Sequence, residues 1–147
     1  MELEQAVFHR IRRVMQEHTA NWQQRLPELT KPQYAVLWAV HEKPGIEQAQ
    51  LGQRAAIDKA TLASLLLRME QRGLIRRTVD ATDRRRRLLE LTEEGKRTLR
   101  RSIPVADAVD SQLLARLTPE ERGELHRLLG KLAAIADDPP AANIEQD

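Results

Sequence analysis

The sequence predicts a mainly α-helical fold of the α+β class with one small β-hairpin. Apolar residues recur at three- and four-residue steps through most of the 147-residue chain, which indicates amphipathic helices. Two short strand-like runs, 74–79 and 88–91, enclose a charged segment that is typical of a hairpin turn. Capping residues precede the helical runs and Gly or Pro follows them, so the helix boundaries can be placed.

Three helices are expected before the hairpin's supporting helix. The first covers residues 3–25, where an apolar stripe recurs until Pro27 stops it. Thr30 and Gln33 have the spacing of a capping box, so a second helix starts there, and the Lys-Pro-Gly segment 43–45 ends it. A short third helix is expected over about residues 47–54.

A fourth helix and two strands are expected next. Asp58 is a natural N-cap for a helix over about residues 59–72, and Gly73 is suited to end that helix. The strands 74–79 and 88–91 follow it. Residues 30–91 thus give three helices and then a hairpin, with two of the helices separated by a tight turn. This order is the outline of a winged helix-turn-helix.

Two more helices and a tail are expected after the hairpin. Thr92 caps a long helix that reaches about residue 115, and Pro104 is expected to kink it. Thr118 opens a second capping box, with Pro at the first helical position, and the helix that follows reaches about residue 136. Residues 137–147 are predicted to be a disordered tail.

The charge is unevenly distributed along the chain. The formal net charge is only +2, but residues 1–53 sum to 0, residues 54–101 to +7 and residues 102–147 to −5. Of the 24 basic residues 19 are Arg, which stays protonated at any ordinary pH. A cationic middle third between neutral and acidic flanks indicates either a polyanionic partner that docks centrally or a solvated face.

The composition excludes several classes of protein. Without Cys there are no disulfides, thiol nucleophiles, thiolate metal sites or thiol redox sensors. No run of about 18 apolar residues could span a membrane, and the acidic N-terminus lacks the layout of a secretory signal, so a cytoplasmic protein is expected. Aromatic residues make up 3%, too few for single-stranded nucleic-acid stacking. The four His have no ligand spacing, so no metal site is expected, and no cofactor is expected either.

The helix predicted over residues 59–72 has two contrasting faces. The stripe that must face the core holds Leu62, Leu65, Leu66 and Met69. The opposite face is small and polar, so its backbone could approach a groove floor while Thr or Ser bonds base edges, Ala or Leu touches a thymine methyl and Arg reaches guanine or phosphate. Its candidate DNA contacts are Lys59, Ala60, Thr61, Ser64, Leu67 and Arg68. A plain surface helix would show the same pattern, so the helix alone leaves both interpretations open.

The predicted hairpin tip favours DNA. Asp83 is followed there by four consecutive Arg residues: Arg84, Arg85, Arg86 and Arg87. Adjacent guanidinium groups repel one another and gain nothing from burial, which favours contact with a phosphate backbone and a narrow minor groove over a solvated loop. Asp83 is expected to hold a neighbouring Arg in a bidentate pair, or else to serve only as a turn residue.

These motifs together resemble one family of regulators. The spacing Asp83-x-Arg85 with Leu91-Thr92 and Gly95 behind it resembles the wing signature of the MarR family of transcription regulators. The segments 58–61 and 68–77 resemble that family's recognition helix and first wing strand, and 30–34 resembles the opening of its second helix. Two residues depart from the pattern. Leu67 replaces a usual Asp, and Ala56 stands where the turn often has Gly, so this turn is expected to lack a positive φ angle.

The resemblance implies one chain, 1–147, that forms a homodimer on palindromic double-stranded DNA. Residues 30–92 would form the DNA-binding lobe, and residues 3–26 and 93–136 would form the dimerisation helices. The residues themselves agree, because the C-terminal helices carry more apolar side chains than a monomer could cover. They are Ile103, Val105, Val109, Leu113, Leu114, Leu117, Leu125, Leu128, Leu129 and Leu132. The alternative is that these helices only complete the core of a monomer.

The resemblance also implies a small-molecule effector, often an aromatic carboxylate. All four Phe, Trp and Tyr residues lie in the first two helices, close in sequence to His and Arg, and such a set could stack on a ring and bond a carboxylate. The candidate ligand residues are His9, Arg13, Trp22, Tyr34 and Trp38. The simpler alternative makes the aromatics core residues and the Arg residues surface residues.

The sequence therefore predicts a DNA-binding transcription regulator, most plainly a homodimeric repressor that an aromatic acid releases from its operator. Two alternatives come from other classes. One is an interaction adaptor that keeps the winged fold without binding DNA, although the Arg-rich tip argues against it. The other is a small all-helical enzyme, which would need a catalytic constellation that the sequence does not display.

Overall fold

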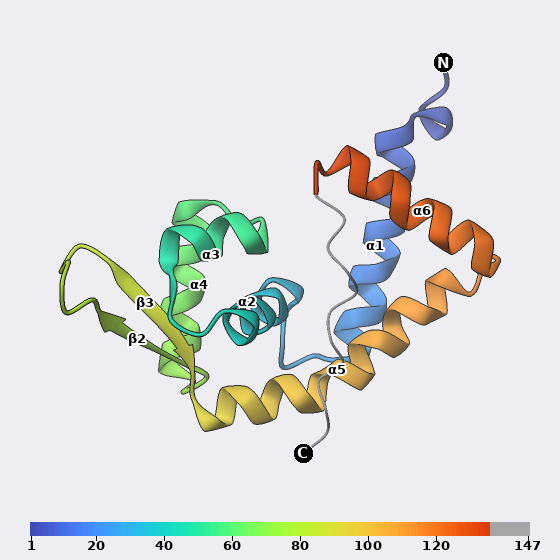
Figure 1. Ribbon diagram of the computed structural model, residues 1–147. Coiled ribbons are helices and arrows are strands. Elements are labelled where there is room, and N and C mark those ends of the chain that lie inside the picture. The colour runs from blue at the N-terminus through green and yellow to red at the C-terminus, as the bar shows by residue number, and fades with distance from the viewer. Residues whose placement is uncertain (136–147) are drawn as a thin grey trace. The chain divides into compact units, whose positions relative to one another are not determined.

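The structure, a computed structural model, describes residues 1–135 (Figure 1). A first compact unit comprises Met1–Asp110, and a second begins at Ser111. The first unit opens with a 3-10 turn, η1 (Leu3–Gln5), and the helix α1 (Val7–Arg25). The helix expected from residue 3 thus begins at Val7, because Ala6 is extended at φ −71° and ψ 127°. The helix ends at Arg25, two residues before Pro27, as predicted.

The helix α2 (Lys31–Glu42) starts at the predicted capping box. Thr30 accepts a hydrogen bond from the Gln33 backbone N–H at 3.2 Å, and the Gln33 side-chain oxygen accepts from the Thr30 N–H at 3.0 Å. The same Gln33 oxygen also accepts a bond at 3.4 Å from the guanidinium of Arg72, which follows the helix α4 (Lys59–Gln71). Gln33 is 8% exposed, so this buried amide joins the start of α2 to the end of α4.

The turn between α3 (Gln48–Ala55) and α4 corrects one expectation. Ala56 has φ +56° and ψ +46°, the left-handed conformation, so the turn does use a positive φ angle although no Gly is present. Its backbone N–H bonds to the Gln53 carbonyl, and the Ile57 N–H bonds to the Gly52 carbonyl. This conformation is strained for a residue with a Cβ atom and is held by the surrounding turn.

Ala56→Gly should therefore stabilise the protein, by about 1 kcal/mol, since Gly adopts positive φ without steric cost. Ala20→Gly, in the exposed interior of α1, is the matched control and should lower the free energy of unfolding by about the same amount. Thermal unfolding of the two variants measures both effects. Destabilisation by both substitutions would mean that Ala56 is not strained.

A three-stranded antiparallel sheet has the order β1-β3-β2. The hairpin pairs β2 (Ile75–Val79) with β3 (Arg87–Leu91), and Figure 1 shows this hairpin projecting from the helices α2 to α4. The strand β1 (Ile46–Glu47) was not predicted, because its two residues show no periodicity and their pairing with Leu88 and Leu89 is non-local. The sheet shares one core with the helices, in which Leu37, Leu66 and Leu89 are fully buried.

The helix α5 (Glu93–Leu114) runs on from the hairpin, with Pro104 inside it. Within the first unit Ala106 and Val109 of α5 pack on Trp22 and Leu26 in a second, smaller core. The helix α6 (Pro119–Leu132) opens at the predicted Thr118 capping box but ends four residues before the expected position. The predicted disordered tail, 137–147, lies outside the described residues. No helix in residues 1–135 is long and apolar enough to cross a membrane.

Candidate nucleic-acid interface

The helix α4 presents the two faces that the sequence predicts. Leu62, Leu66 and Met69 are at most 2% exposed and lie in the core. The other side is open to solvent, and its exposed residues are Lys59, Ala60, Thr61, Ala63, Ser64, Leu67, Arg68 and Gln71. Within residues 1–135 the side chains of Lys59, Ser64 and Arg68 have no hydrogen-bond or ionic partner, so they are free to contact a ligand.

The N-cap of α4 engages one of the predicted base-reading residues. Asp58 accepts hydrogen bonds from the backbone N–H of Thr61 at 2.9 Å and from the Thr61 hydroxyl at 2.7 Å. These two bonds, the backbone one foremost, hold the pKa of Asp58 below its ordinary value. The Thr61 hydroxyl proton is therefore committed to the cap, and only its lone pairs remain for a further contact.

The four Arg residues of the hairpin tip divide into two kinds. Arg86 contacts Glu47 of β1 at 3.4 Å and Asp80 at 3.3 Å, and Arg87 donates to the Arg84 carbonyl at 2.7 Å. The pKa of Asp80 is lowered, first by the Thr82 backbone N–H and also by Arg86. Arg86 thus joins the hairpin to β1, and its side chain stays 44% exposed, so its contact with DNA remains a prediction.

Arg84 and Arg85 remain available at the tip. The Arg84 side chain has no partner in residues 1–135, and the Arg85 side chain is 92% exposed. Asp83 accepts from the backbone N–H of Arg85 at 3.0 Å and from its Nε at 3.3 Å, both through Oδ1. The expected bidentate pair is therefore absent, and Asp83 shapes the turn while it holds Arg85.

A further residue fixes the hairpin beside α4. Arg77 of β2 pairs with Glu70 of α4 at 3.6 Å and donates to Gln48 of α3 at 3.4 Å. Lys59 and Arg85 line one open cavity of about 640 Å³, between the α3–α4 turn and the hairpin. The start of α4 and the hairpin tip consequently face the same space. Sequence reasoning missed Arg77, because its partners come from separate helices.

The aromatic residues predicted to bind a ligand form a ladder across α1 and α2. The ring centroids are 5.1 Å apart for Trp22 and Tyr34 and 6.4 Å apart for Tyr34 and Trp38. Trp22 is 4% exposed and donates its indole N–H to the Leu29 carbonyl at 2.7 Å, so it is a core residue. Tyr34 and Trp38 are half-buried, and burial raises the pKa of the Tyr34 hydroxyl.

A polar group that the sequence reasoning missed borders this ladder. His18 lies 6.2 Å from the Trp22 ring, Lys31 Nζ is 3.1 Å from His18 Nδ1, and Asp110 Oδ1 is 2.6 Å from His18 Nε2. Burial lowers the pKa of Lys31, although Asp110 opposes this effect. The only sequence signal was that His18 precedes Trp22 by one helical turn.

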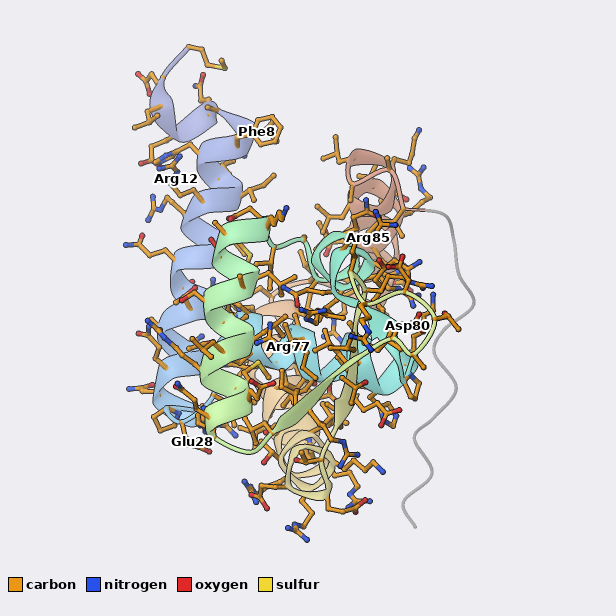
Figure 2. The ribbon with its side chains drawn as sticks, turned by 90° about the vertical axis from the view of Figure 1, so that its left-hand side faces the viewer. Phe8, Arg12, Glu28, Arg77, Asp80 and Arg85 are labelled. Carbon is orange, nitrogen blue, oxygen red and sulfur yellow. The ribbon has the colours of Figure 1, made fainter. Side chains whose placement is uncertain are left out.

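His9 and Arg13 are not brought to the ladder within this chain. Both contact Glu4, His9 at 3.6 Å and Arg13 at 2.8 Å, and Arg13 is the chief cause of the lowered pKa of Glu4. His9 precedes Trp22 by 13 residues of α1, which is about 20 Å along a helix. Figure 2 shows the neighbouring Phe8 projecting from the N-terminal end of that helix. Within residues 1–135 no three His, Cys, Asp or Glu side chains are grouped to hold a metal ion.

Comparisons with known proteins agree with this geometry. Residues 29–86 match the MarR family. The transcriptional regulator HosA of Escherichia coli is 51% identical over 132 residues, which cover 90% of this chain and 98% of that protein. The PcaV transcriptional regulator from Streptomyces coelicolor, solved with its natural ligand, has a TM-score of 0.87 and 35% identity, and the match covers 93% of this chain and 98% of that chain.

A third match concerns BpsR of Bordetella bronchiseptica. Its structure has a TM-score of 0.87 and 31% identity over 93% of this chain and 99% of that chain, and it was solved to explain how 6-hydroxynicotinic acid regulates DNA binding. These relatives are transcription regulators and not enzymes. With α4 and the hairpin arranged as a winged helix-turn-helix, the chain belongs to the MarR family of DNA-binding transcription regulators.

Proposed function

We propose that this protein is a homodimeric repressor that binds a palindromic operator and leaves it when a small aromatic carboxylate binds. The DNA part rests on the free face of α4 and on two exposed Arg side chains at the hairpin tip, Arg84 and the Asp83-held Arg85. Ser64 and Arg68 would read the major groove, and Lys59, Arg84 and Arg85 would contact the phosphates and the minor groove. The protein would act in the cytoplasm, where it would meet its operator.

Exposed apolar side chains support the homodimer. In α1 and the turn before it Leu3, Val7 and Phe8 are 61–75% exposed, and near the end of the described chain Leu132 and Ile135 are about two-thirds exposed. Such side chains favour association with a second copy of the chain. Val109, in contrast, is fully buried against Trp22, so part of α5 completes the core of each protomer. The division into a lobe, 30–92, and dimerisation helices, 3–26 and 93–136, otherwise stands as part of this proposal.

The aromatic ladder and its polar border support the ligand class. Tyr34 and Trp38 offer half-buried ring faces, and Lys31 and His18 offer hydrogen-bond donors beside them. A carboxylate on an aromatic ring could replace Asp110 as the partner of His18 and accept a further bond from the Lys31 ammonium group. The regulation of BpsR by 6-hydroxynicotinic acid, an aromatic carboxylic acid, is in keeping with this class.

A selection experiment tests the function. The full-length protein is incubated with a pool of random duplexes, and the bound duplexes are amplified and sequenced. We expect an inverted repeat whose half-sites are centred about ten base pairs apart, since two recognition helices of a dimer enter successive major grooves. Sedimentation should give a dimer mass. A pool that stays random at low salt would contradict the proposal.

Ligand release gives a sharper prediction. Lys31→Met should raise the concentration of aromatic acid needed to release the operator by at least tenfold, because a charge-assisted hydrogen bond is lost. Lys43→Met is the matched control, since Lys43 lies at the other end of α2 and its ammonium group donates to the Gln50 side chain. Fluorescence anisotropy of labelled operator, titrated with hydroxylated benzoic and nicotinic acids, measures the release. Equal release from both variants would remove Lys31 from the ligand site.

A further inference from the structure

Leu67 is an isolated apolar residue on the free face of α4. Its side chain is 48% exposed. The other large apolar side chains that are exposed in residues 1–135 lie on α1 and α6 or near the chain ends, with Val79 of the hairpin as the exception. About half of the Leu67 side chain is open to solvent, so this apolar surface is available to whatever binds the face.

The residues around Leu67 leave it prominent. It lies five residues after the buried Leu62, which places it about 140° around the helix from the core. The residues one turn earlier on the same side, Ala63 and Ser64, are small and exposed, as is Ala60 a further turn back. Leu67 is therefore the largest apolar side chain on a face whose other nearby residues are small or polar.

The chemistry of the groove limits what this surface can meet. In the major groove every base edge offers hydrogen-bond donors or acceptors, and the one apolar group is the 5-methyl of thymine. The Thr61 hydroxyl already donates its proton to Asp58, so it has no proton left to donate to a base edge. Ser64 and Arg68 remain to bond polar edges on either side of Leu67.

We propose that Leu67, supported by Ala63, packs on the 5-methyl group of one thymine in each half-site and so selects a T·A pair at that position. The proposal rests on the proposed function, because it assumes that α4 enters the major groove. It adds a specificity-determining contact that depends on a single methyl group. Removal of that methyl should weaken binding about fourfold in one half-site, as for one buried methyl-sized group, and about fifteenfold in both.

Deoxyuridine substitution isolates this contact, because deoxyuridine lacks only the methyl of thymine and keeps its hydrogen-bonding edge. The probe is the consensus duplex from the selection, with each thymine replaced in turn by deoxyuridine in both half-sites. Dissociation constants are measured for the wild-type protein, for Leu67→Ala and for Ser64→Ala as the matched control. We expect one position at which the wild type and Ser64→Ala lose about fifteenfold while Leu67→Ala loses nothing further.

Each result bears on the proposal. A deoxyuridine penalty that persists in Leu67→Ala, or the absence of any sensitive position in the wild type, would overturn the methyl contact and leave the proposed function intact. Failure to select any duplex would instead refute the proposed function itself. Leu67→Gln is measured alongside, and thermal unfolding of both variants should match the wild type. Loss of folding in both would make Leu67 a structural residue and overturn the contact.

Discussion

Replacing Arg84 and Arg85 together with Ala should lower operator affinity at least a hundredfold and flatten its dependence on salt. Both side chains are exposed at the hairpin tip, where Arg85 contacts Asp83 of the same turn, whereas Arg86 is held by Glu47 and Asp80. Four guanidinium groups would be lost from a dimer. If each contacts a phosphate, the slope of log affinity against log salt should become shallower by about 3.6. Anisotropy titrations at several salt concentrations measure both quantities.

A second double variant separates local contact from net charge. Arg100 and Arg101 of α5 are exposed, and Arg100→Ala with Arg101→Ala removes the same charge from α5, outside the hairpin. This pair should change operator affinity only slightly. Equal losses in the two double variants would mean that the hairpin tip acts through the overall charge and makes no contact of its own. Both proteins should unfold at the wild-type temperature, because the substituted side chains are exposed.

Gly95→Ala should cause the largest loss of stability, about 3 kcal/mol, with a fall in melting temperature of about 10 °C. The first turn of α5 lies directly on the backbone that opens β2. Thr92 donates its N–H to the Leu74 carbonyl at 3.1 Å, and the Gly95 N–H donates to the Thr92 hydroxyl at 3.0 Å. A Cβ atom on Gly95 would overlap the carbonyl oxygen of Leu74, which is backbone and cannot rotate away.

The contrast with Gly123 makes this prediction specific. Gly123 lies inside α6, and a Cβ atom added there meets nothing within 4 Å. Gly123→Ala should therefore raise the free energy of unfolding by up to about 1 kcal/mol through helix propensity. Calorimetry of the two variants should give shifts of opposite sign. A wild-type melting temperature for Gly95→Ala would show that the junction of α5 with β2 tolerates a methyl group.

The parts of the fold that the sequence predicted well are those that local chemistry decides. The capping boxes at Thr30 and Thr118 close within four residues, and α2 and α6, which follow them, begin where they were expected. The buried stripe of α4 follows from a period of 3.6 residues. The strand β1 was missed, since it exists only because Ile46 meets Leu89, more than 40 residues away.

In the candidate sites, too, the sequence could not predict contacts between residues that are distant in the chain. The sequence indicated the Arg run at the hairpin tip, but it could not separate Arg86 from Arg85. That separation depends on Glu47, which reaches Arg86 only through the sheet. Likewise Lys31, His18 and Asp110 come from α2, α1 and α5, and they meet only because the chain folds these helices together. Pairings of this kind become visible only when the chain is folded.

The buried amide of Gln33 has a thermodynamic consequence. Its oxygen serves both the first turn of α2, two residues from Lys31, and the guanidinium of Arg72 at the end of α4. A ligand that moves the start of α2 would therefore act on the recognition helix through a single shared acceptor. Linkage is reciprocal, so under the proposed function operator binding would weaken ligand binding by the same factor by which ligand binding weakens operator binding. Protein already seated on DNA would then respond only at higher ligand concentrations than free protein, which sets the threshold for induction.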